Sequence, residues 1–416
     1  MEKKLHTIEL FAGCGGLLDG FLQEGHFDTL ACVEWEKYPC LTLANRLSKK
    51  WHHKNANNEV IRFDIQRTDE LINGFDDAEY GKHSGLASLI GTKTVDVIVG
   101  GPPCQAYSLA GRIRDEHGMK EDYRNYLFES YIKIVKHFKP RFFVFENVIG
   151  ILSAAPDGYP IVNRIRNAFM EAGYKVAEDF KDTLFEVADF GIPQHRRRVI
   201  IIGVRMDEFD KNDSDYCVTD KMIHDFYATI MPSMRKKSKT VSEAIGDLPK
   251  IYPLEEPIRE NGKKYSHAPI MSKDVLNHIP RFHSKRDIDV FRLLAEDIRS
   301  GRKEYVSIEK LKELYTKVTG KKSNIHKYYV LRQDEPSNTI PAHLYKDGMR
   351  HIHPDPEQAR SITVREAARL QSFPDTFIFE GPLMHIQQQI GNAVPPLLAK
   401  AVFQQIIKQT KEHEQR

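Results

Sequence analysis

Three short stretches of the sequence carry residues whose types suit covalent or acid–base chemistry. GGPPCQ at 100–105 places the thiol of Cys104 on a loop stiffened by two prolines. A thiolate is a strong nucleophile, although a lone cysteine behind a strand is more often inert packing. Glu146 in ENV offers a carboxyl for proton transfer, and QHRRR offers Arg196 and Arg198. These two arginines lie two positions apart, so in an extended strand they would share one face, and alone they would mean only a solvated edge.

A second set of residues could bind a cofactor that carries a nucleoside. FAGCGG at 11–16 is a glycine-rich turn behind an apolar run, where a ligand can approach the backbone closely. Its spacing is not that of the dinucleotide fingerprint, so alone it is equally a structural turn. Glu34 could accept hydrogen bonds from ribose hydroxyls, Trp35 offers an apolar face to a purine, and Asp64 could accept from an exocyclic amine. Taken singly, each acid could also be a helix cap or a solvated charge.

The elements that must position these residues alternate in the first two hundred positions. Apolar runs such as HTIELF, TLACVE, VDVIVG, RFFVFENV and RRRVIIIGV are separated by helical patterns such as NYLFESYIKIVKHF. This alternation predicts an α/β domain with a doubly wound, mostly parallel sheet and ligands at the carboxyl ends of its strands. After about residue 205 the pattern becomes irregular, with a strand-like YYVLR at 328–332. The closing LLAKAVFQQIIKQ at 397–409 predicts an amphipathic helix that docks on the first domain.

Composition narrows the class of protein. The 416 residues contain 61 Lys and Arg against 58 Asp and Glu, so nucleic-acid affinity would have to come from local clusters of basic residues. The five cysteines are too few and too irregular for a disulfide framework, and neither they nor the histidines show the spacing of a metal site. No signal-peptide core or long apolar run is present, which predicts an intracellular protein without a membrane span.

Taken together and in order, these motifs resemble those of the C5-cytosine DNA methyltransferases, which methylate cytosine with S-adenosylmethionine. The resemblance covers nearly the whole chain, and its pieces are FAGCGG, Glu34 with Trp35, Asp64, GGPPCQ, ENV, QHRRR, TVREAARLQSFPD (363–375) and GNAVPP (391–396). Roughly 215–360 matches little beyond TVSEAIGDLP (240–249) and the stretch leading to IHPD (352–355). In this family such a region holds target-recognition residues. The implied fold is a Rossmann-like S-adenosylmethionine methyltransferase sheet with a second, smaller, irregular domain.

The resemblance also implies catalytic roles. Cys104 would add to C6 of the target cytosine, which makes C5 able to take a methyl group. Glu146 would hold a proton at N3 and contact the exocyclic amine, which calls for a carboxyl whose pKa is raised. Arg196 would contact the base, and Arg198 would organise the nucleophile loop and target phosphates.

S-adenosylmethionine is the implied cofactor, and no metal is implied. The methionine end of the cofactor would contact Phe11, Gly13 and Gly16, and its ribose would contact Glu34. The adenine would contact Trp35, Asp64 and Ile65. The remaining walls of the cofactor site would be formed by Leu127, Asn392 and Val394.

Attack on C6 requires the cytosine to leave the stacked duplex. The polar loop after Cys104 carries Gly111 and Gly118 and is the expected lid over DNA. The residues expected to meet DNA or to line the lid are Gln105, Ser108, Arg112, Arg114 and Gln194, and any one of them could equally belong to an ordinary solvated loop.

The expected catalytic domain comprises 1–215 plus 386–416, and the target-recognition domain with its hinge comprises 216–385. The expected partner is double-stranded DNA, together with a cognate restriction endonuclease acting on the same site. We expect a monomer in the bacterial cytoplasm, associated with the nucleoid.

Three other readings remain open. A tRNA cytosine methyltransferase of the same family would share PPCQ and ENV, although the long variable region favours reading DNA. A catalytically silent binding regulator would not need Cys104, Glu146 and Arg196 together. A nicotinamide-dependent enzyme would leave GGPPCQ unexplained.

Overall fold

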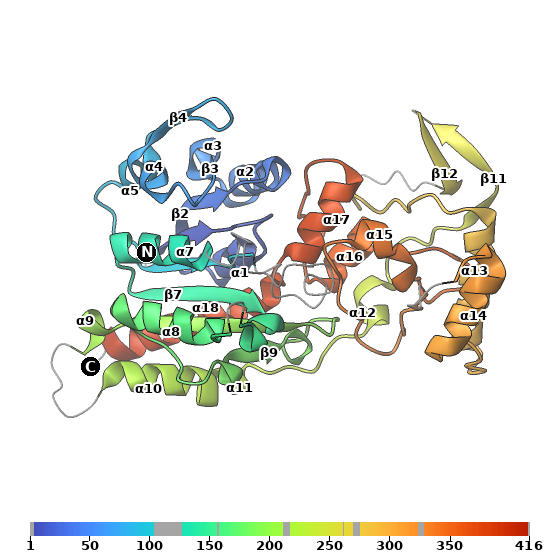
Figure 1. Ribbon diagram of the computed structural model, residues 1–416. Coiled ribbons are helices and arrows are strands. Elements are labelled where there is room, and N and C mark those ends of the chain that lie inside the picture. Colours follow the sequence, from blue (N-terminus) through green and yellow to red (C-terminus); the bar gives the residue numbers. More distant parts are fainter. Residues whose placement is uncertain are drawn as a thin grey trace. The chain divides into compact units, whose positions relative to one another are not determined.

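The computed structural model divides the chain into two compact units (Figure 1). It describes residues 4–103, 127–155, 158–210, 217–260, 262–268, 275–322 and 328–414. The first unit comprises Met1–Phe190, Arg197–Lys236 and Ala393–Arg416, and the second comprises Gly191–Arg196 and Lys237–Asn392. The boundaries between the units therefore fall at 236/237 and 392/393, whereas the sequence led us to expect 215/216 and 385/386. In addition, residues 191–196 belong to the second unit although the chain on both sides of them belongs to the first, and we call this six-residue segment the excursion.

The first unit is built on one mixed sheet with the order β3-β2-β1-β6-β7-β10-β8, and β9 pairs with β10. The strands are β1 (Leu5–Leu10), β2 (Phe27–Glu34), β3 (Val60–Arg62), β6 (Val97–Gly100), β7 (Phe142–Val148), β8 (Tyr174–Lys175), β9 (Leu184–Glu186) and β10 (Arg197–Arg205). The five strands from β3 to β7 pair in parallel, and β10 runs antiparallel to β7. The chain builds outward from β1 in one direction and then from β6 in the other, which confirms the predicted doubly wound, mostly parallel sheet.

Helices cover this sheet, and a small hairpin follows β3. The helices are α1 (Gly16–Glu24), α2 (Lys37–Trp51), α3 (Ala56–Glu59), α4 (Thr68–Asn73), α5 (Gly85–Ile90), α7 (Leu127–Phe138), α8 (Ile161–Glu171), α9 (Met206–Phe209), α10 (Val218–Asp225), α11 (Met231–Ser233) and α18 (Pro396–Glu414). The hairpin is formed by β4 (Phe75–Asp77) and β5 (Gly81–His83). None of the helices in the described ranges is long and apolar enough to cross a membrane.

The C-terminal helix docks on the first unit, as its amphipathic pattern predicts. Helix α18, red in Figure 1, packs along α1 near the start of the chain. The Phe403 ring lies 5.0 Å from that of Phe21 and 4.9 Å from that of Phe27, centroid to centroid. A Cβ at Gly20 would come within 2.5 Å of the Ala399 side chain, so glycine permits the close approach of the two helices.

The regular elements of the second unit are mainly helices, joined by long irregular segments. Its elements are α12 (Val241–Ile245), β11 (Pro253–Glu260), β12 (Lys263–His267), α13 (Lys285–Arg299), α14 (Ile308–Thr319), α15 (Leu344–Asp347), α16 (Val364–Leu370) and α17 (Leu383–Asn392). A core cluster that includes Phe291, Leu294 and Tyr328 packs α13 against α14. The strand predicted at 328–332 does not form, since only an isolated bridge joins Val330 to Ile352. The segment carries apolar side chains into the core without a neighbouring strand to pair with.

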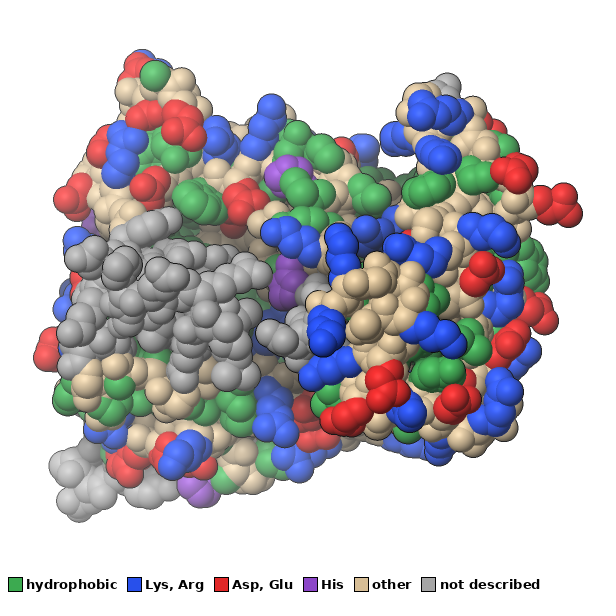
Figure 2. Space-filling model, turned by 45° about the vertical axis from the view of Figure 1, so that its right-hand side comes forward, with side chains coloured by type: hydrophobic (Ala, Val, Ile, Leu, Met, Phe, Trp, Pro, Cys, Tyr) green, Lys and Arg blue, Asp and Glu red, His purple; other side chains and the backbone are tan. Residues whose placement is uncertain are grey.

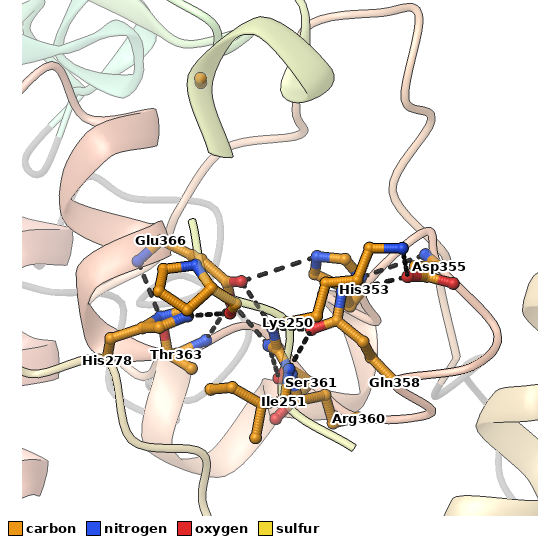
Figure 3. Close-up of polar contacts among 12 residues, drawn as sticks. Lys250, Ile251, His278, His353, Asp355, Gln358, Arg360, Ser361, Thr363 and Glu366 are labelled. Atoms are coloured by element: carbon orange, nitrogen blue, oxygen red, sulfur yellow. Dashed lines mark hydrogen bonds and ion pairs between the residues drawn. The ribbon is translucent and has the colours of Figure 1, made fainter. Parts of the chain in front are cut away.

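A buried polar network joins the 353–361 segment to α16 (Figure 3). Both terminal nitrogens of Arg360 donate to the Glu366 carboxylate at 2.7 Å. The same carboxylate accepts from the backbone N–H of Thr363, the N-cap of α16, at 2.6 Å, and the Thr363 hydroxyl accepts from the Glu366 N–H. Burial at Glu366 would raise its pKa, but the charge and hydrogen bonds of Arg360 outweigh burial and hold that pKa below the usual value. The buried carboxylate is therefore matched by a buried cation, while Arg360 Nε makes no hydrogen bond within the described residues.

Buried histidines surround this network. His278 Nδ1 lies 3.0 Å from the Thr363 hydroxyl, and His353 Nε2 lies 3.6 Å from Glu366 Oε1. Burial lowers the pKa of His267 and His353 to about 4 and that of His283 to about 3, and it also lowers that of His278. At neutral pH these rings are uncharged.

Candidate active site

The loop after β1 has the backbone shape that its glycines predict. Phe11, Gly13 and Gly15 adopt the left-handed region, with φ of 54°, 55° and 87°. Helix α1 then begins at Gly16, so backbone N–H groups of its first turn lie at the carboxyl end of β1. A Cβ at Gly13 would meet nothing within 4 Å, whereas Gly15 and Gly16 are buried, so the loop is open at Gly13, at the end of the sheet where ligands bind in doubly wound folds.

Glu34 ends β2 beside this loop and accepts three backbone hydrogen bonds. Its Oε2 accepts from the N–H of Gly13 at 2.8 Å, and its Oε1 accepts from those of Trp35 and Glu36 at 2.9 and 2.8 Å. Burial raises the pKa of Glu34 to about 7, against the lowering effect of these amides. The carboxylate thus fixes the loop and retains lone pairs for ribose hydroxyls.

The residues expected around adenine follow β2 and β3. The Trp35 side chain is 55% exposed, so one apolar face is available to a ligand. Asp64 uses Oδ1 to accept from the Gln66 N–H at 3.0 Å, while Ile65 and Leu127 are buried. The sequence did not point to Arg62, whose Nε donates to the Trp35 carbonyl at 3.1 Å.

Val394, on the segment before α18, approaches the glycine loop directly. A Cβ at Gly16 would lie 2.3 Å from the Val394 carbonyl oxygen, so no larger residue fits there without movement. Asn392 is exposed at the end of α17 and belongs to the second unit. The residues of the first unit therefore fit S-adenosylmethionine: a glycine-lined loop for the methionine end, a carboxylate for the ribose and an exposed indole for the adenine.

The second centre lies at the carboxyl ends of β6 and β7. Arg198 Nε lies 2.7 Å from Glu146 Oε1, and both side chains are nearly buried. Burial lowers the pKa of Arg198, while Glu146 acts in the opposite direction. A Cβ at Gly101 would lie 2.4 Å from Glu146 Oε2, so the glycine of GGPPCQ makes room for this carboxylate. Arg198 therefore holds one oxygen, and the other faces the loop that leads to Cys104.

Asn147 was missed by the sequence analysis. Its side-chain amide donates to the Pro102 carbonyl at 3.2 Å and so ties the strand that carries Glu146 to the proline loop. The signal was a buried amide directly after Glu146 in an otherwise apolar strand, where an amide needs a partner.

Comparison with known proteins assigns the chain to a protein family. The family described as C-5 cytosine-specific DNA methylase matches residues 5–408. The chain belongs to this family. It is 33% identical to the type II methyltransferase M.Bpa9945I of Bacillus paralicheniformis over 94% of this chain and 96% of that protein. It is 32% identical to M.DdeI of Desulfomicrobium norvegicum, with 97% and 88% of the two chains covered.

Solved structures support the fold of this methylase. A protein of an E. coli prophage, assigned as a DNA modification methyltransferase, superposes with a TM-score of 0.60 at 24% identity over 98% of this chain and 100% of that one. S. pombe Dnmt2 methyltransferase gives 0.52 at 13% identity over 99% of both chains. The protein is thus a C5-cytosine DNA methyltransferase, and its family uses S-adenosylmethionine.

Gln194 and Arg196 of the methylase lie in the second unit, and their side chains bind backbone there. Gln194 Oε1 accepts from the Ile340 N–H at 2.9 Å. Arg196 donates to the carbonyls of Ile340 and Gly391 at 2.9 and 2.8 Å. β10 begins at Arg197, so Arg196 lies one residue before the strand, and the expectation that Arg196 and Arg198 share one face stays a prediction. Arg196 belongs to the excursion, which is held by the 337–340 segment.

Some of the expected residues of the methylase lie outside the part of the chain that the structure describes: Cys104, Gln105, Ser108, Gly111, Arg112, Arg114 and Gly118. Among the described residues, no group of three or more His, Cys, Asp or Glu side chains could hold a metal ion. The cysteines in the described ranges form no disulfide: Cys14, Cys32 and Cys40 are buried and Cys217 is exposed.

Proposed function

We propose that this methylase transfers a methyl group from S-adenosylmethionine to C5 of a flipped-out cytosine in a specific short duplex sequence, through a covalent bond between Cys104 and C6. The observation that supports it most is the placement of Glu146, held by Arg198 on one side and apposed to Gly101 on the other. The Asn147 hydrogen bond to Pro102 joins that carboxyl to the loop that enters Cys104. Nucleophile and acid would thus be presented by one linked unit.

The proposed chemistry divides between these residues. The Cys104 thiolate adds to C6 while Glu146 holds a proton at N3, so the negative charge that develops on the ring is neutralised. When bound, S-adenosylmethionine supplies the methyl group at C5. The C5 proton then passes to solvent water, the C6–S bond breaks and releases Cys104 as a thiolate, the N3 proton returns to Glu146, and S-adenosylhomocysteine is the co-product. Throughout, Arg198 would keep the carboxyl oriented, and Arg196 would contact the base.

The cofactor would lie over the loop that ends β1. Glu34 would accept from the ribose, Trp35 and Ile65 would contact adenine, and Asp64 would accept from its amine. The remaining proposed contacts are Phe11, Gly13, Gly16, Leu127, Asn392 and Val394.

DNA reading is assigned to the second unit. Figure 2 shows many Lys and Arg side chains on its right-hand part, interspersed with Asp and Glu. The exposed cations of this unit include Lys285, Arg286, Arg299, Arg302, Lys303, Lys310, Lys317, Lys321, Lys322 and Lys346. Such clusters bind phosphates, whereas base contacts give specificity. Gln105, Ser108, Arg112, Arg114 and Gln194 would approach DNA from the loop and the excursion.

We also propose that the enzyme acts as a monomer in the bacterial cytoplasm, on nucleoid DNA, and protects the site of a partner restriction endonuclease. The bacterial type II methyltransferases that it resembles support the proposed bacterial origin and the link to a restriction endonuclease.

The test is transfer of labelled methyl from S-adenosylmethionine to unmethylated plasmid, followed by bisulfite sequencing. Wild type should label one short motif, Cys104→Ser should not, and Cys217→Ser is the matched control because its thiol is exposed and remote in sequence. Label on RNA alone would replace DNA as the substrate. Full activity of Cys104→Ser would refute the covalent step.

A further inference from the structure

Glu9 is a buried carboxyl to which the proposed mechanism gives no part. It lies in β1, in register with Cys32 of β2 and Val99 of β6, two residues before the cofactor loop. It is 1% exposed, and neither carboxyl oxygen makes a hydrogen bond of normal geometry within the described part of the chain. An unsatisfied polar group at such a position costs stability, so its presence calls for another reason.

The surroundings of Glu9 supply little positive charge. Cys14 from the loop, Cys32 and Glu34 from β2, and Asp19 from α1 are the titratable groups nearby, and Val97–Gly100 of β6 adds none. Asp19 is paired with Arg46 at 2.7 Å. Burial raises the pKa of Glu9 well above its usual value, the Glu34 charge adds to this, and only the Leu18 backbone N–H opposes it.

The two forms of the cofactor differ in the charge on their sulfur. S-adenosylmethionine carries a sulfonium and so has a net charge of about +1, whereas the product, S-adenosylhomocysteine, is a neutral thioether zwitterion. A positive charge placed over a buried, protonated carboxyl favours its ionisation, and removal of that charge favours reprotonation. The rest of the ligand is the same in both forms.

We propose that Glu9 releases its proton when S-adenosylmethionine binds over the 11–16 loop and takes a proton back once the neutral product remains. The inference rests on the proposed cofactor site. One proton passes to solvent on binding and one returns after methyl transfer, so no redox partner is needed. Glu9 thereby sets the preference for methyl donor over spent product.

Isothermal titration calorimetry tests this in two buffers of different ionisation enthalpy at pH 7.5. The difference between the two ligands in protons released isolates the response to the sulfonium, because the amino acid and ribose groups cancel. Wild type should release about one proton more with S-adenosylmethionine than with S-adenosylhomocysteine. In Glu9→Gln, which keeps the shape without a titrating group, the difference should vanish. Its preference for S-adenosylmethionine should fall about tenfold, the equivalent of one pKa unit.

Glu171→Gln is the matched control, since it removes an exposed carboxyl at the end of α8 in the same unit and should keep the proton difference between the ligands. Equal proton counts for the two ligands in wild type would overturn the inference, even if Glu9→Gln failed to fold. A difference that persists in Glu9→Gln would also overturn it. If wild type bound neither ligand, the proposed cofactor site itself would fail, an outcome distinct from binding without proton release.

Discussion

Acid should unfold the second unit before the first, because its polar network is ringed by uncharged histidines. The pKa values of His267 and His353, about 4, and of His283, about 3, lie below the 6.5 of an unfolded histidine. As pH falls, these histidines therefore bind protons in the unfolded chain at a higher pH than in the folded chain. The free energy of unfolding that is present above pH 6.5 is lost as the pH falls toward 4. From pH 7 to pH 5, each histidine removes about 2 kcal/mol of the free energy of unfolding, and the three remove about 5 to 6 kcal/mol. Such a loss is comparable to the whole stability of many domains, about 5 to 15 kcal/mol.

Hydrogen exchange with mass spectrometry measures this unit by unit. Peptides covering 350–370 should lose protection steeply between pH 7 and pH 5, after correction for intrinsic exchange, while peptides from β1 and β2 change less. His353→Gln should lower the pH dependence by about a third, and His224→Gln, whose side chain is 74% exposed in the first unit, should leave it unchanged. Both tryptophans, Trp35 and Trp51, lie in the first unit, so their fluorescence is a separate readout. Equal protection of 350–370 at pH 7 and pH 5 would refute the reasoning.

Three further predictions concern the site. Gly101→Ala should lower kcat at least tenfold with an unchanged Kd for S-adenosylhomocysteine, because its Cβ displaces the Glu146 carboxylate; a full-rate variant would contradict the packing. The Kd of S-adenosylhomocysteine in wild type should rise by up to tenfold per pH unit below about pH 7, as Glu34 gains a proton and loses acceptor capacity, whereas Glu34→Gln should bind weakly at every pH. In a Trp51→Phe background, Arg62→Leu should change Trp35 fluorescence and weaken cofactor binding severalfold, since the Trp35 carbonyl loses its donor; unaltered emission and affinity would count against this.

Local pattern was enough to predict the scaffold. The five apolar runs became β1, β2, β6, β7 and β10, and Glu34 lies at the end of its strand, because β-branched periodicity and strand ends are local properties. The C-terminal helix could also be predicted, since its amphipathic pattern is local and its apolar face must pack on a surface.

Contacts between segments that are distant in the sequence could not be predicted from it. Asn147 reaches Pro102 and Arg196 reaches Gly391, and nothing in the residue types selects these partners. YYVLR has strand-like residues, but a strand also needs a neighbour with a free edge, and tertiary context overrode propensity there. The burial of Glu9, whose carboxyl oxygens make no hydrogen bond of normal geometry within the described residues, likewise appears only once the sheet is formed.

The excursion at 191–196 has a consequence for modular exchange. Replacing 237–392 with the corresponding segment of a relative, to change the DNA sequence recognised, would leave the six-residue excursion behind. Gln194 and Arg196 would then have to bind a foreign backbone in place of Ile340 and Gly391. A working chimaera therefore needs residues 191–196 and 237–392 from the same donor, because the second unit is made of two segments that are separate in the sequence.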